Sequence, residues 1–268
     1  MTLTVLVAGG TGHLGRSVVD RLVEAGHDVR VLARNQRDTQ PQVTFFTGDL
    51  RQDQGIDAAV RGAEVIINCA TSAKGDAEVT ANLVRAAARA GSPHFVQPSI
   101  VGIDTMPQWG YVKTKLKVEQ IVENCGLPWT MLRITQFYSY LFENSRKRAK
   151  LPLAAPVPAH FRVQPVDPRD AGVRIAELAM GAPAGRAPDM SGPEVTTMGD
   201  MFHSYLAATH QRKWVFSVPF PGGKAISNGS LLPPPDHTEG ARTWDQFLAQ
   251  ELAGQGGGLD PASRVKRA

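Results

Sequence analysis

Closely spaced glycines mark the beginning of the chain, in the sequence Gly9-Gly10-Thr11-Gly12-His13-Leu14-Gly15. They separate an apolar run at residues 3–8, typical of a buried strand, from an amphipathic stretch at residues 18–23. A glycine turn between a strand and a helix places the helix N-terminus against a pyrophosphate group. The sequence therefore predicts a dinucleotide site with contacts from Gly9, Thr11, Gly12, His13, Leu14 and Gly15.

The spacing of these glycines gives each one a physical task. One permits the tight turn, one lets the ligand approach the backbone, and one lets the helix pack close to the strand. The pattern Gly9-x-x-Gly12-x-x-Gly15 differs from the common G-x-G-x-x-G, and this difference bears on the family. His13 either touches a phosphate or fills the exposed side of the turn.

The end of the second expected strand, residues 28–33, indicates which dinucleotide binds. A protein selective for NAD places Asp or Glu there to bind the ribose 2′-hydroxyl. Here Ala33 and Arg34 stand at that place, and Arg37 follows. Because a guanidinium can pair with a 2′-phosphate, we predict NADP(H). The alternative is that Arg34 is solvated and that NAD or no dinucleotide binds.

Asp49 follows the third expected strand, within Gly48-Asp49-Leu50. Its carboxylate either holds the adenine amino group or caps the following turn.

Strand and helix patterns alternate along the first 135 residues, which predicts a parallel sheet covered on both faces. The expected strands are residues 3–8, 28–33, 43–47, 65–68, 94–98 and 129–134. The expected helices are residues 13–25, 56–61, 76–90 and 111–124. The predicted fold class is α/β, a Rossmann-type doubly wound parallel sheet with a smaller, irregular C-terminal substrate-binding region.

The alternation stops after Gln136. Helices are expected at residues 137–150, 170–180 and 198–209, loops at 151–158 and 219–235, and disorder from Gly254. We divide the chain into an NADP(H)-binding domain at 1–136, on which residues 165–180 pack back, a substrate-binding region at 137–253, and a disordered tail at 254–268.

Composition and charge exclude several classes of protein. Hydrophobic residues make up 42% of the chain and charged residues 20%, as in ordinary globular proteins. No apolar run is long enough to cross a membrane, and we expect no signal peptide. The net charge is only +4, and the basic run Arg146-Lys147-Arg148-Ala149-Lys150 has no interleaved aromatics. We interpret this run as a solvated helix end and expect no nucleic acid or membrane partner.

Cys69 and Cys125 are the two cysteines of the chain, and we interpret both as small core residues in a reducing cytoplasm. No His pair has metal-ligand spacing and no G-x-S-x-G elbow occurs, so we expect neither a metal site nor a serine hydrolase. The expected partner is a small-molecule substrate, and homo-oligomerisation stays open.

An ordered set of motifs resembles the short-chain dehydrogenase/reductase superfamily. The set is Gly9-x-x-Gly12-x-x-Gly15, Arg34, Gly48-Asp49-Leu50 and Asn68-Cys69-Ala70. Residues 128–137 and the stretch Gln164-Pro165-Val166-Asp167-x-x-Asp170 narrow the resemblance to the atypical NmrA-like branch, which includes quinone and triphenylmethane reductases and redox-sensing regulators. The resemblance covers residues 1–210. It implies an NADP(H) site to which Asp49, Leu50, Cys69 and Ala70 belong.

Reductases of this superfamily use Ser, Tyr and Lys, and the corresponding residues here are Ser99, Tyr111 and Lys115. Tyr111 and Lys115 are four residues apart and therefore share one helix face. The lysine ammonium would lower the phenol pKa and could also bind the nicotinamide ribose. Tyr111 would then donate the proton, and Ser99 would polarise the substrate carbonyl.

A structural role for Tyr111 is the alternative, because many members of the branch keep the lysine and lack the tyrosine. Trp109-Gly110-Tyr111 would then simply pack at a helix start. Lys113 and Lys117 lie two residues either side of Lys115 and are expected in solvent.

The substrate pocket is expected at the carboxyl ends of the strands, under the second half of the chain. The candidate walls are Phe137, Tyr138, Tyr140, Phe142, Phe161 and Trp214. These aromatics favour an apolar or aromatic substrate, and the predicted function is an NADPH-dependent reductase of a carbonyl, quinone or conjugated double bond. Two alternatives stay open: a non-catalytic NADP(H) sensor that binds a partner protein, and an epimerase, dehydratase or cyclase that retains its nucleotide.

Overall fold

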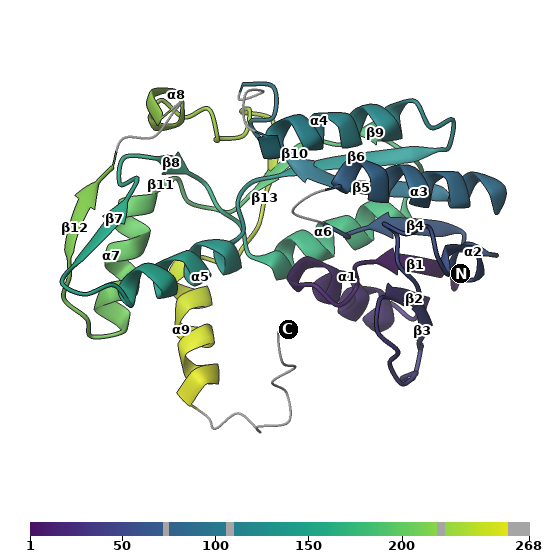
Figure 1. Ribbon diagram of the computed structural model, residues 1–268, viewed down its shortest axis with the longest axis horizontal. Coiled ribbons are helices and arrows are strands. Elements are labelled where there is room, and N and C mark those ends of the chain that lie inside the picture. Colours follow the sequence, from purple (N-terminus) through teal and green to yellow (C-terminus); the bar gives the residue numbers. More distant parts are fainter. Residues whose placement is uncertain (72–74, 106–109, 219–222, 257–268) are drawn as a thin grey trace.

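One large, mostly parallel sheet organises the protein, as the computed structural model shows for residues 1–71, 75–105, 110–218 and 223–256 (Figure 1). The central strands run in the order β3-β2-β1-β4-β5-β6 and are all parallel. They are β1 (Thr4–Ala8), β2 (Asp28–Ala33), β3 (Val43–Thr47), β4 (Val65–Asn68), β5 (His94–Ile100) and β6 (Trp129–Ile134). The predicted α/β fold class is confirmed.

Continuous burial explains why these segments form strands. All four residues of β4 are buried, as are Val5 to Ala8 of β1. A strand covered on both faces has no solvated side, so its sequence is apolar throughout instead of alternating. The predicted ranges 28–33, 43–47, 65–68 and 129–134 coincide with β2, β3, β4 and β6, although β3, at the edge of the sheet, is only partly buried.

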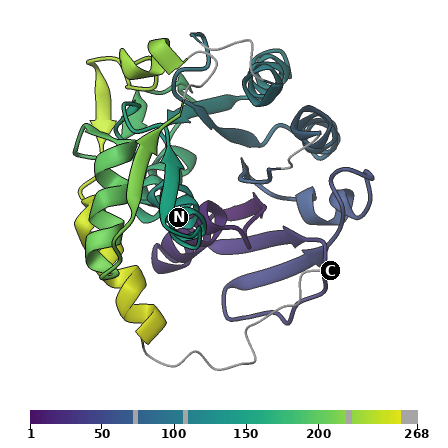
Figure 2. The same cartoon turned by 60° about the vertical axis from the view of Figure 1, so that its left-hand side comes forward.

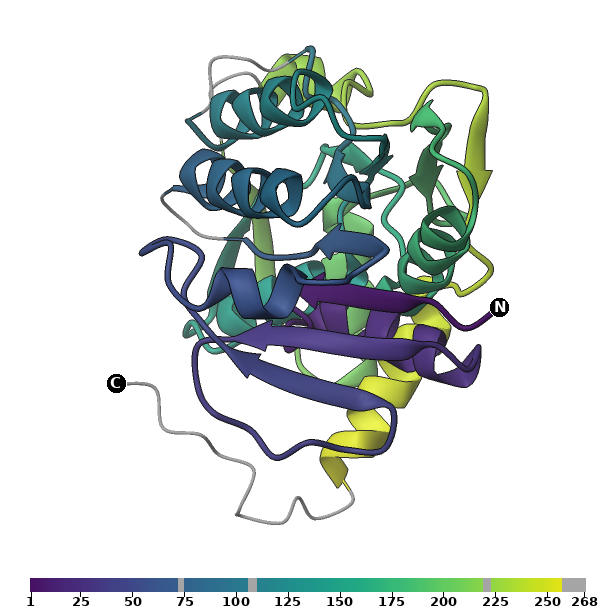
Figure 3. The same cartoon turned by 90° about the vertical axis from the view of Figure 1, so that its right-hand side faces the viewer.

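Helices cover both faces of the sheet. In this half of the fold they are α1 (His13–Glu24), α2 (Ile56–Val60), α3 (Asp76–Arg89), α4 (Gly110–Glu123) and α6 (Pro168–Met180). α1 and α6 pack on one face around Leu22 and Ile175, and α2, α3 and α4 pack on the other around Leu83 and Val122. Figure 3 shows α3 and α4 lying side by side above strands β1 to β3.

α6 returns from the second half of the chain to the first. Asp167 caps its N-terminus, where its Oδ1 accepts a hydrogen bond from the backbone N–H of Arg169 at 2.8 Å. α6 packs closely on α1, because a Cβ at Gly172 would lie 2.6 Å from the Cβ of Ser17. Residues 165–180 thus lie against the nucleotide-binding half.

The sheet also continues beyond β6. Strand β10 (Asp189–Ser191) pairs with β6 and β13 (His237–Glu239) pairs with β10, while β9 (Gly185–Arg186) pairs with β6. Parts of the region from 137 to 253 therefore belong to the large sheet, so a boundary at residue 136 does not separate two continuous pieces.

The remaining elements form a smaller lobe beside the carboxyl ends of the strands (Figures 1 and 2). They are α5 (Tyr138–Ala149), β7 (Ala154–Val157), β8 (Arg162–Val163), β11 (Thr196–Thr197), α7 (Met198–Ala208), β12 (Trp214–Ser217), α8 (Gly223–Ser227) and α9 (Trp244–Gly256). Their apolar side chains, with Phe142, Phe202 and Phe247 at the centre, form a separate core that also takes in Val112 of α4.

Three predictions for this lobe were wrong in part. The expected loop at 151–158 contains β7, which pairs in parallel with β12. The expected loops at 219–235 contain α8, and α9 extends past Gly254, where disorder was expected. Pro156 discouraged a strand prediction, but a two-stranded sheet has only edge strands, where proline is tolerated. Residues 219–222 and 257–268, which also carried predictions, lie outside the described residues.

Within the part of the chain that the structure describes, no helix combines the length and the apolarity that a membrane crossing would require.

Candidate active site

A cavity of about 630 Å³ lies at the carboxyl ends of the central strands, beside the glycine turn. It opens where β1 lies between β4 and β2, the point at which the strand order reverses direction along the chain. Open α/β sheets bind their ligands at such a point. The predicted cofactor residues that line the cavity are Gly9, Thr11, Gly12, Arg34, Asp49, Leu50, Cys69 and Ala70.

Gly9 and Gly15 hold the glycine turn in its shape. Gly9 has a φ of +75°, and a Cβ on it would lie 2.6 Å from the backbone nitrogen of Ala70. A Cβ on Gly15 would lie 2.2 Å from the carbonyl oxygen of Gly9. Any larger residue at either position would displace backbone, so these two glycines bring the strand, the turn and the helix close together.

The N-terminus of α1 faces this turn with its backbone donors uncapped. Gly12 is the N-cap residue, no side chain hydrogen-bonds to it, and the first turn of the helix carries no acidic residue. The backbone N–H groups and the positive end of the helix dipole are therefore free to bind an anion. These features fit the pyrophosphate of a dinucleotide. His13 is exposed, Leu14 half-buried and Gly15 buried, and none of the three lines the cavity.

Two arginines line the cavity, and one of them, Arg34, stands where the adenosine 2′ position is expected. Arg34 follows β2 and is exposed, and Arg51 stands beyond β3. No acidic residue occupies the end of β2, whose last residue is Ala33. This arrangement fits a 2′-phosphate better than a 2′-hydroxyl. Arg51 was not among the predicted cofactor residues, although its place directly after Gly48-Asp49-Leu50 could have indicated a contact with the cofactor. Arg37 does not line the cavity.

Asp49 caps the turn that follows β3. Its Oδ1 accepts hydrogen bonds from the backbone N–H groups of Arg51 at 2.8 Å and Gln52 at 3.3 Å. The capping role is thus present in the structure. Because Asp49 also lines the cavity, an additional contact with adenine stays a prediction.

Lys115 is almost completely buried on α4 and pairs with Asp76 of α3. Its Nζ lies 2.9 Å from Asp76 Oδ2, and both side chains are at most 6% exposed. The same Nζ lies 5.7 Å from the centroid of the Tyr111 ring. Asp76 therefore balances the charge of the lysine that was predicted to act on Tyr111 and on the nicotinamide ribose. Lys113 and Lys117 are exposed, as predicted.

Cys69 lies between the cavity and the sheet. Burial raises the pKa of its thiol to about 12, and the charge of Lys115 offsets only part of this effect. The thiol is therefore protonated near neutral pH and offers the site a small neutral wall. This position fits both predictions for Cys69, a small core residue and a cofactor neighbour.

A second cavity of about 550 Å³ lies at the same edge of the sheet and has mostly apolar walls. Tyr111, which is 54% exposed, lines it together with Ser99 and Phe137. Tyr111 and Lys115 thus lie on the same face of α4, as predicted. Tyr111 lines the second cavity, and the Lys115 ammonium lies next to its ring. Trp109 lies outside the described residues.

Ser99 is buried near the end of β5 and lines the second cavity. The hydroxyl also lies close to Glu119 of α4. Burial raises the pKa of Glu119, but hydrogen bonding with Arg133 and Ser99 and the charges of Arg133 and Arg186 outweigh burial and lower it. Arg133 binds Glu119 through two nitrogens, at 2.9 and 2.8 Å. Ser99 therefore adjoins an ion-pair network as well as the cavity.

Four of the six candidate substrate walls line neither cavity: Tyr138, Phe142, Phe161 and Trp214. Tyr138 is 1% exposed, and its ring packs against Trp244 and Phe247 in the core of the smaller lobe, which also contains Phe142. Trp214 is 84% exposed on β12. These expectations are corrected for one reason: aromatic composition does not tell a pocket wall from a core or surface residue. Phe137 and Tyr140 line the second cavity.

Several known sequences resemble this chain. A family model described as NAD(P)H-binding matches residues 9–150. The (4-alkanoyl-5-oxo-2,5-dihydrofuran-3-yl)methyl phosphate reductase of Streptomyces griseus subsp. griseus is 32% identical over 200 residues, covering 72% of this chain and 69% of that protein. An isoflavone reductase homolog of Solanum tuberosum is 28% identical over 158 residues, 52% of this chain, and the chain spans 51% of that relative's length. The chain belongs to the NAD(P)H-binding family.

Solved structures with the same fold include reductases. An NADPH-dependent quinone oxidoreductase from Escherichia coli, complexed with NADPH, superposes with a TM-score of 0.77 at 16% identity over 92% of this chain and 99% of that one. The Citrobacter sp. triphenylmethane reductase, complexed with NADP(H), gives 0.76 at 16% identity with the same coverage. A mutant of NmrA gives 0.69 at 19% identity over 97% of this chain and 98% of that one. These structures share the fold of this chain, and the family match supports the binding of a nicotinamide dinucleotide, NAD(P)H.

Proposed function

We propose that this protein is an NADPH-dependent reductase that acts on a carbonyl, quinone or conjugated double bond of an apolar small molecule. The observation that carries the proposal is the position of Tyr111, whose phenol lines an apolar cavity directly in front of the buried Lys115. The Streptomyces relative is named as a reductase, which supports an oxidoreductase.

Each residue of the site has a task that follows from its surroundings. Bound NADPH would supply a hydride from its nicotinamide. Tyr111 donates the proton to the substrate, because its exposed phenol lies in the cavity wall next to the charge of Lys115. Lys115, fixed by Asp76, holds a positive charge behind the ring and binds the nicotinamide ribose. The buried Ser99 hydroxyl, turned from Glu119 toward the cavity, donates a hydrogen bond to the acceptor oxygen of the substrate.

The apolar cavity walls select the substrate class. Ile100, Val112, Ile134, Phe137 and Leu231 line the space around Tyr111. Such walls favour a substrate whose reducible group is attached to an apolar or aromatic body. The reducing cofactor and the two unpaired cysteines support a cytoplasmic location for this activity.

The first test is NADPH oxidation by the purified protein with a panel of quinones and ketones. We expect turnover that falls by about a hundredfold in Tyr111→Phe and in Lys115→Ala, since general acid catalysis contributes about that much. Tyr140→Phe and Lys113→Ala are matched controls, because Tyr140 lines the same cavity without a neighbouring lysine and Lys113 is exposed. NADPH oxidation that is indifferent to both substitutions would remove the assigned roles.

The two alternative functions give different results in the same assay. A redox sensor would show no turnover with any acceptor and would bind NADP⁺ and NADPH with different affinities. An epimerase, dehydratase or cyclase would convert its substrate without net consumption of NADPH. The exposure of Tyr111 in a substrate-sized cavity favours the reductase over the sensor.

A further inference from the structure

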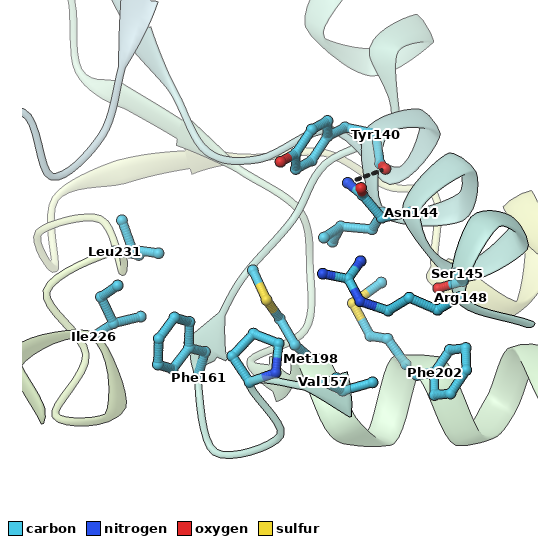
Figure 4. A pocket seen from close by; sticks show the side chains of 13 residues that line it. Tyr140, Asn144, Ser145, Arg148, Val157, Phe161, Met198, Phe202, Ile226 and Leu231 are labelled. Atoms are coloured by element: carbon cyan, nitrogen blue, oxygen red, sulfur yellow. Dashed lines mark hydrogen bonds between the residues drawn. The ribbon is translucent and has the colours of Figure 1, made fainter. Parts of the chain in front are cut away.

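A third cavity, of about 210 Å³, adjoins the Tyr111 cavity inside the smaller lobe (Figure 4). The two cavities share Tyr140, Met198 and Leu231 as wall residues. The third cavity therefore extends the proposed substrate site away from the sheet, into the space between α5 and α7.

The walls of this cavity are apolar except along α5. Phe161, Met201, Phe202 and Ile226 are among the apolar residues that line it. Asn144, Ser145 and Arg148 of α5 supply its polar atoms, and the Asn144 side-chain amide donates to the backbone oxygen of Tyr140 at 2.9 Å. The polar groups thus gather on one side of an otherwise apolar space (Figure 4).

Arg148 directs its guanidinium toward the interior of this cavity (Figure 4). Its Nε donates to the backbone oxygen of Pro156 at 2.9 Å, which fixes the plane of the group. Within the described ranges no carboxylate lies within ion-pair distance of Arg148. Arg146, two residues earlier on the same helix, is exposed and pairs with Glu143 at 2.9 Å. In the basic run at residues 146–150, the predicted solvated helix end therefore includes Arg146 but not Arg148.

A fixed guanidinium with free donors in an apolar cavity is a binding site for an anion. The group has five N–H donors, of which Pro156 takes one, and its partial burial weakens competition from water. We propose that the substrate is elongated, with an anionic end group bound by Arg148, an apolar body, and a reducible end beside Tyr111. This proposal rests on the proposed reductase function for the reducible end only.

The kinetic test uses naphthoquinones that carry one alkyl chain ending in a carboxylate, a phosphate monoester or a methyl ester. Wild-type protein is expected to have a higher kcat/KM for one or both anions than for the ester, and comparing the two anions identifies the end group. Arg148→Gln should reduce the anion-to-ester ratio of kcat/KM by about tenfold, the effect of losing one charge-assisted pair. Arg146→Gln is the matched control and should leave the ratio unchanged. An unchanged ratio in Arg148→Gln, or a wild-type preference for the ester, would overturn the proposal.

A binding measurement separates this proposal from the reductase function. Calorimetric titration with decanoate, decyl phosphate and methyl decanoate needs no turnover. If wild-type protein reduces no quinone yet binds decanoate or decyl phosphate about tenfold more tightly than Arg148→Gln does, the reductase function fails and the anion site stands. Equal binding by wild type, Arg148→Gln and Arg146→Gln overturns the anion site. Should Arg148→Gln fail to fold, Arg148→Lys, which keeps the charge, must retain part of the preference for anions over the ester; loss of that preference counts against the site.

Discussion

Lys115 and Asp76 form an ion pair inside the protein, with 2.9 Å between Nζ and Oδ2 and almost no exposure of either side chain. The pair joins α4 to α3, and Lys115 is close enough to Cys69, a wall of the nucleotide cavity, to influence its pKa. Asp76 therefore fixes the position of the lysine that stands between the two cavities. We regard Asp76 as a positioning residue of the site.

Removal of Asp76 tests this relationship. Asp76→Ala leaves a buried ammonium without its partner, and such changes cost about 3–5 kcal/mol of unfolding free energy. Urea unfolding of the variant measures the loss. The double variant Asp76→Ala/Lys115→Met should recover part of it, because the uncompensated charge is gone. A single variant as stable as the wild type would show that the pair does not hold the lysine.

Arg34 and Arg51 are expected to determine the choice of cofactor. Arg34→Gln and Arg51→Gln should each raise the KM for NADPH by about tenfold, since each removes a charge-assisted contact with the 2′-phosphate. The KM for NADH should hardly change. Arg37→Gln is the control, because Arg37 does not line the cavity. Equal effects on NADPH and NADH would contradict recognition of the 2′-phosphate by these residues.

Gly15 is expected to tolerate no side chain. Gly15→Ala brings a Cβ to 2.2 Å from the Gly9 carbonyl oxygen, and this overpacking should cost about 2 kcal/mol or more and weaken NADPH binding. Gly110→Ala is the matched control, because Gly110 lies in α4 and no atom of the described residues is within 4 Å of its Cβ position. Thermal unfolding and NADPH titration compare the two variants. If Gly15→Ala behaves like Gly110→Ala, the close contact of turn and helix is not required.

Ionised Glu119 should stabilise the folded protein at pH values above the pKa that this group has in the unfolded chain. In acid, this stabilisation should be lost. Burial opposes ionisation of Glu119, but Arg133, Ser99 and Arg186 together hold its pKa below the ordinary 4.5. Because the folded pKa is the lower one, stability is lost as the pH falls from 4.5 through the folded pKa.

Glu119→Gln should therefore flatten the acid limb of a stability–pH profile measured by urea unfolding. Glu123→Gln, at the other and more accessible carboxylate partner of Arg186, should leave the limb nearly unchanged. Two parallel profiles, for wild type and Glu119→Gln, would show that the folded protein does not lower the pKa of this carboxyl.

Local patterns in the sequence were sufficient to predict the nucleotide-binding half. Residues 65–67 are apolar because both faces of β4 are covered, and Gly15 is required by its close contact with the nearby backbone of Gly9. Arg34 follows a strand whose end faces the cavity. Each of these features is recorded in a short stretch of sequence, so it could be predicted.

The smaller lobe and the ion pairs depend on contacts between distant residues. Trp214 is a surface residue because β12 pairs with β7, about sixty residues earlier in the chain. Asp76 looked like an ordinary first-turn residue of α3, and its pairing with Lys115 follows only from the packing of α3 on α4. Arg148 points inward because Pro156 holds its Nε. No periodicity or motif predicts such contacts.

The proposed hydride transfer from NADPH to the acceptor can be followed directly with deuterium at C4 of the nicotinamide. Wild-type protein is incubated with a quinone or ketone acceptor and NADPH that carries deuterium at C4 of the nicotinamide, and both products are analysed by mass spectrometry. We predict that the deuterium leaves one face of the nicotinamide and that acceptor consumption slows when that face is labelled, with Tyr111→Phe reducing the rate and Tyr140→Phe preserving it. Retention of deuterium in the nucleotide, whichever face is labelled, together with an unchanged acceptor, would contradict the account.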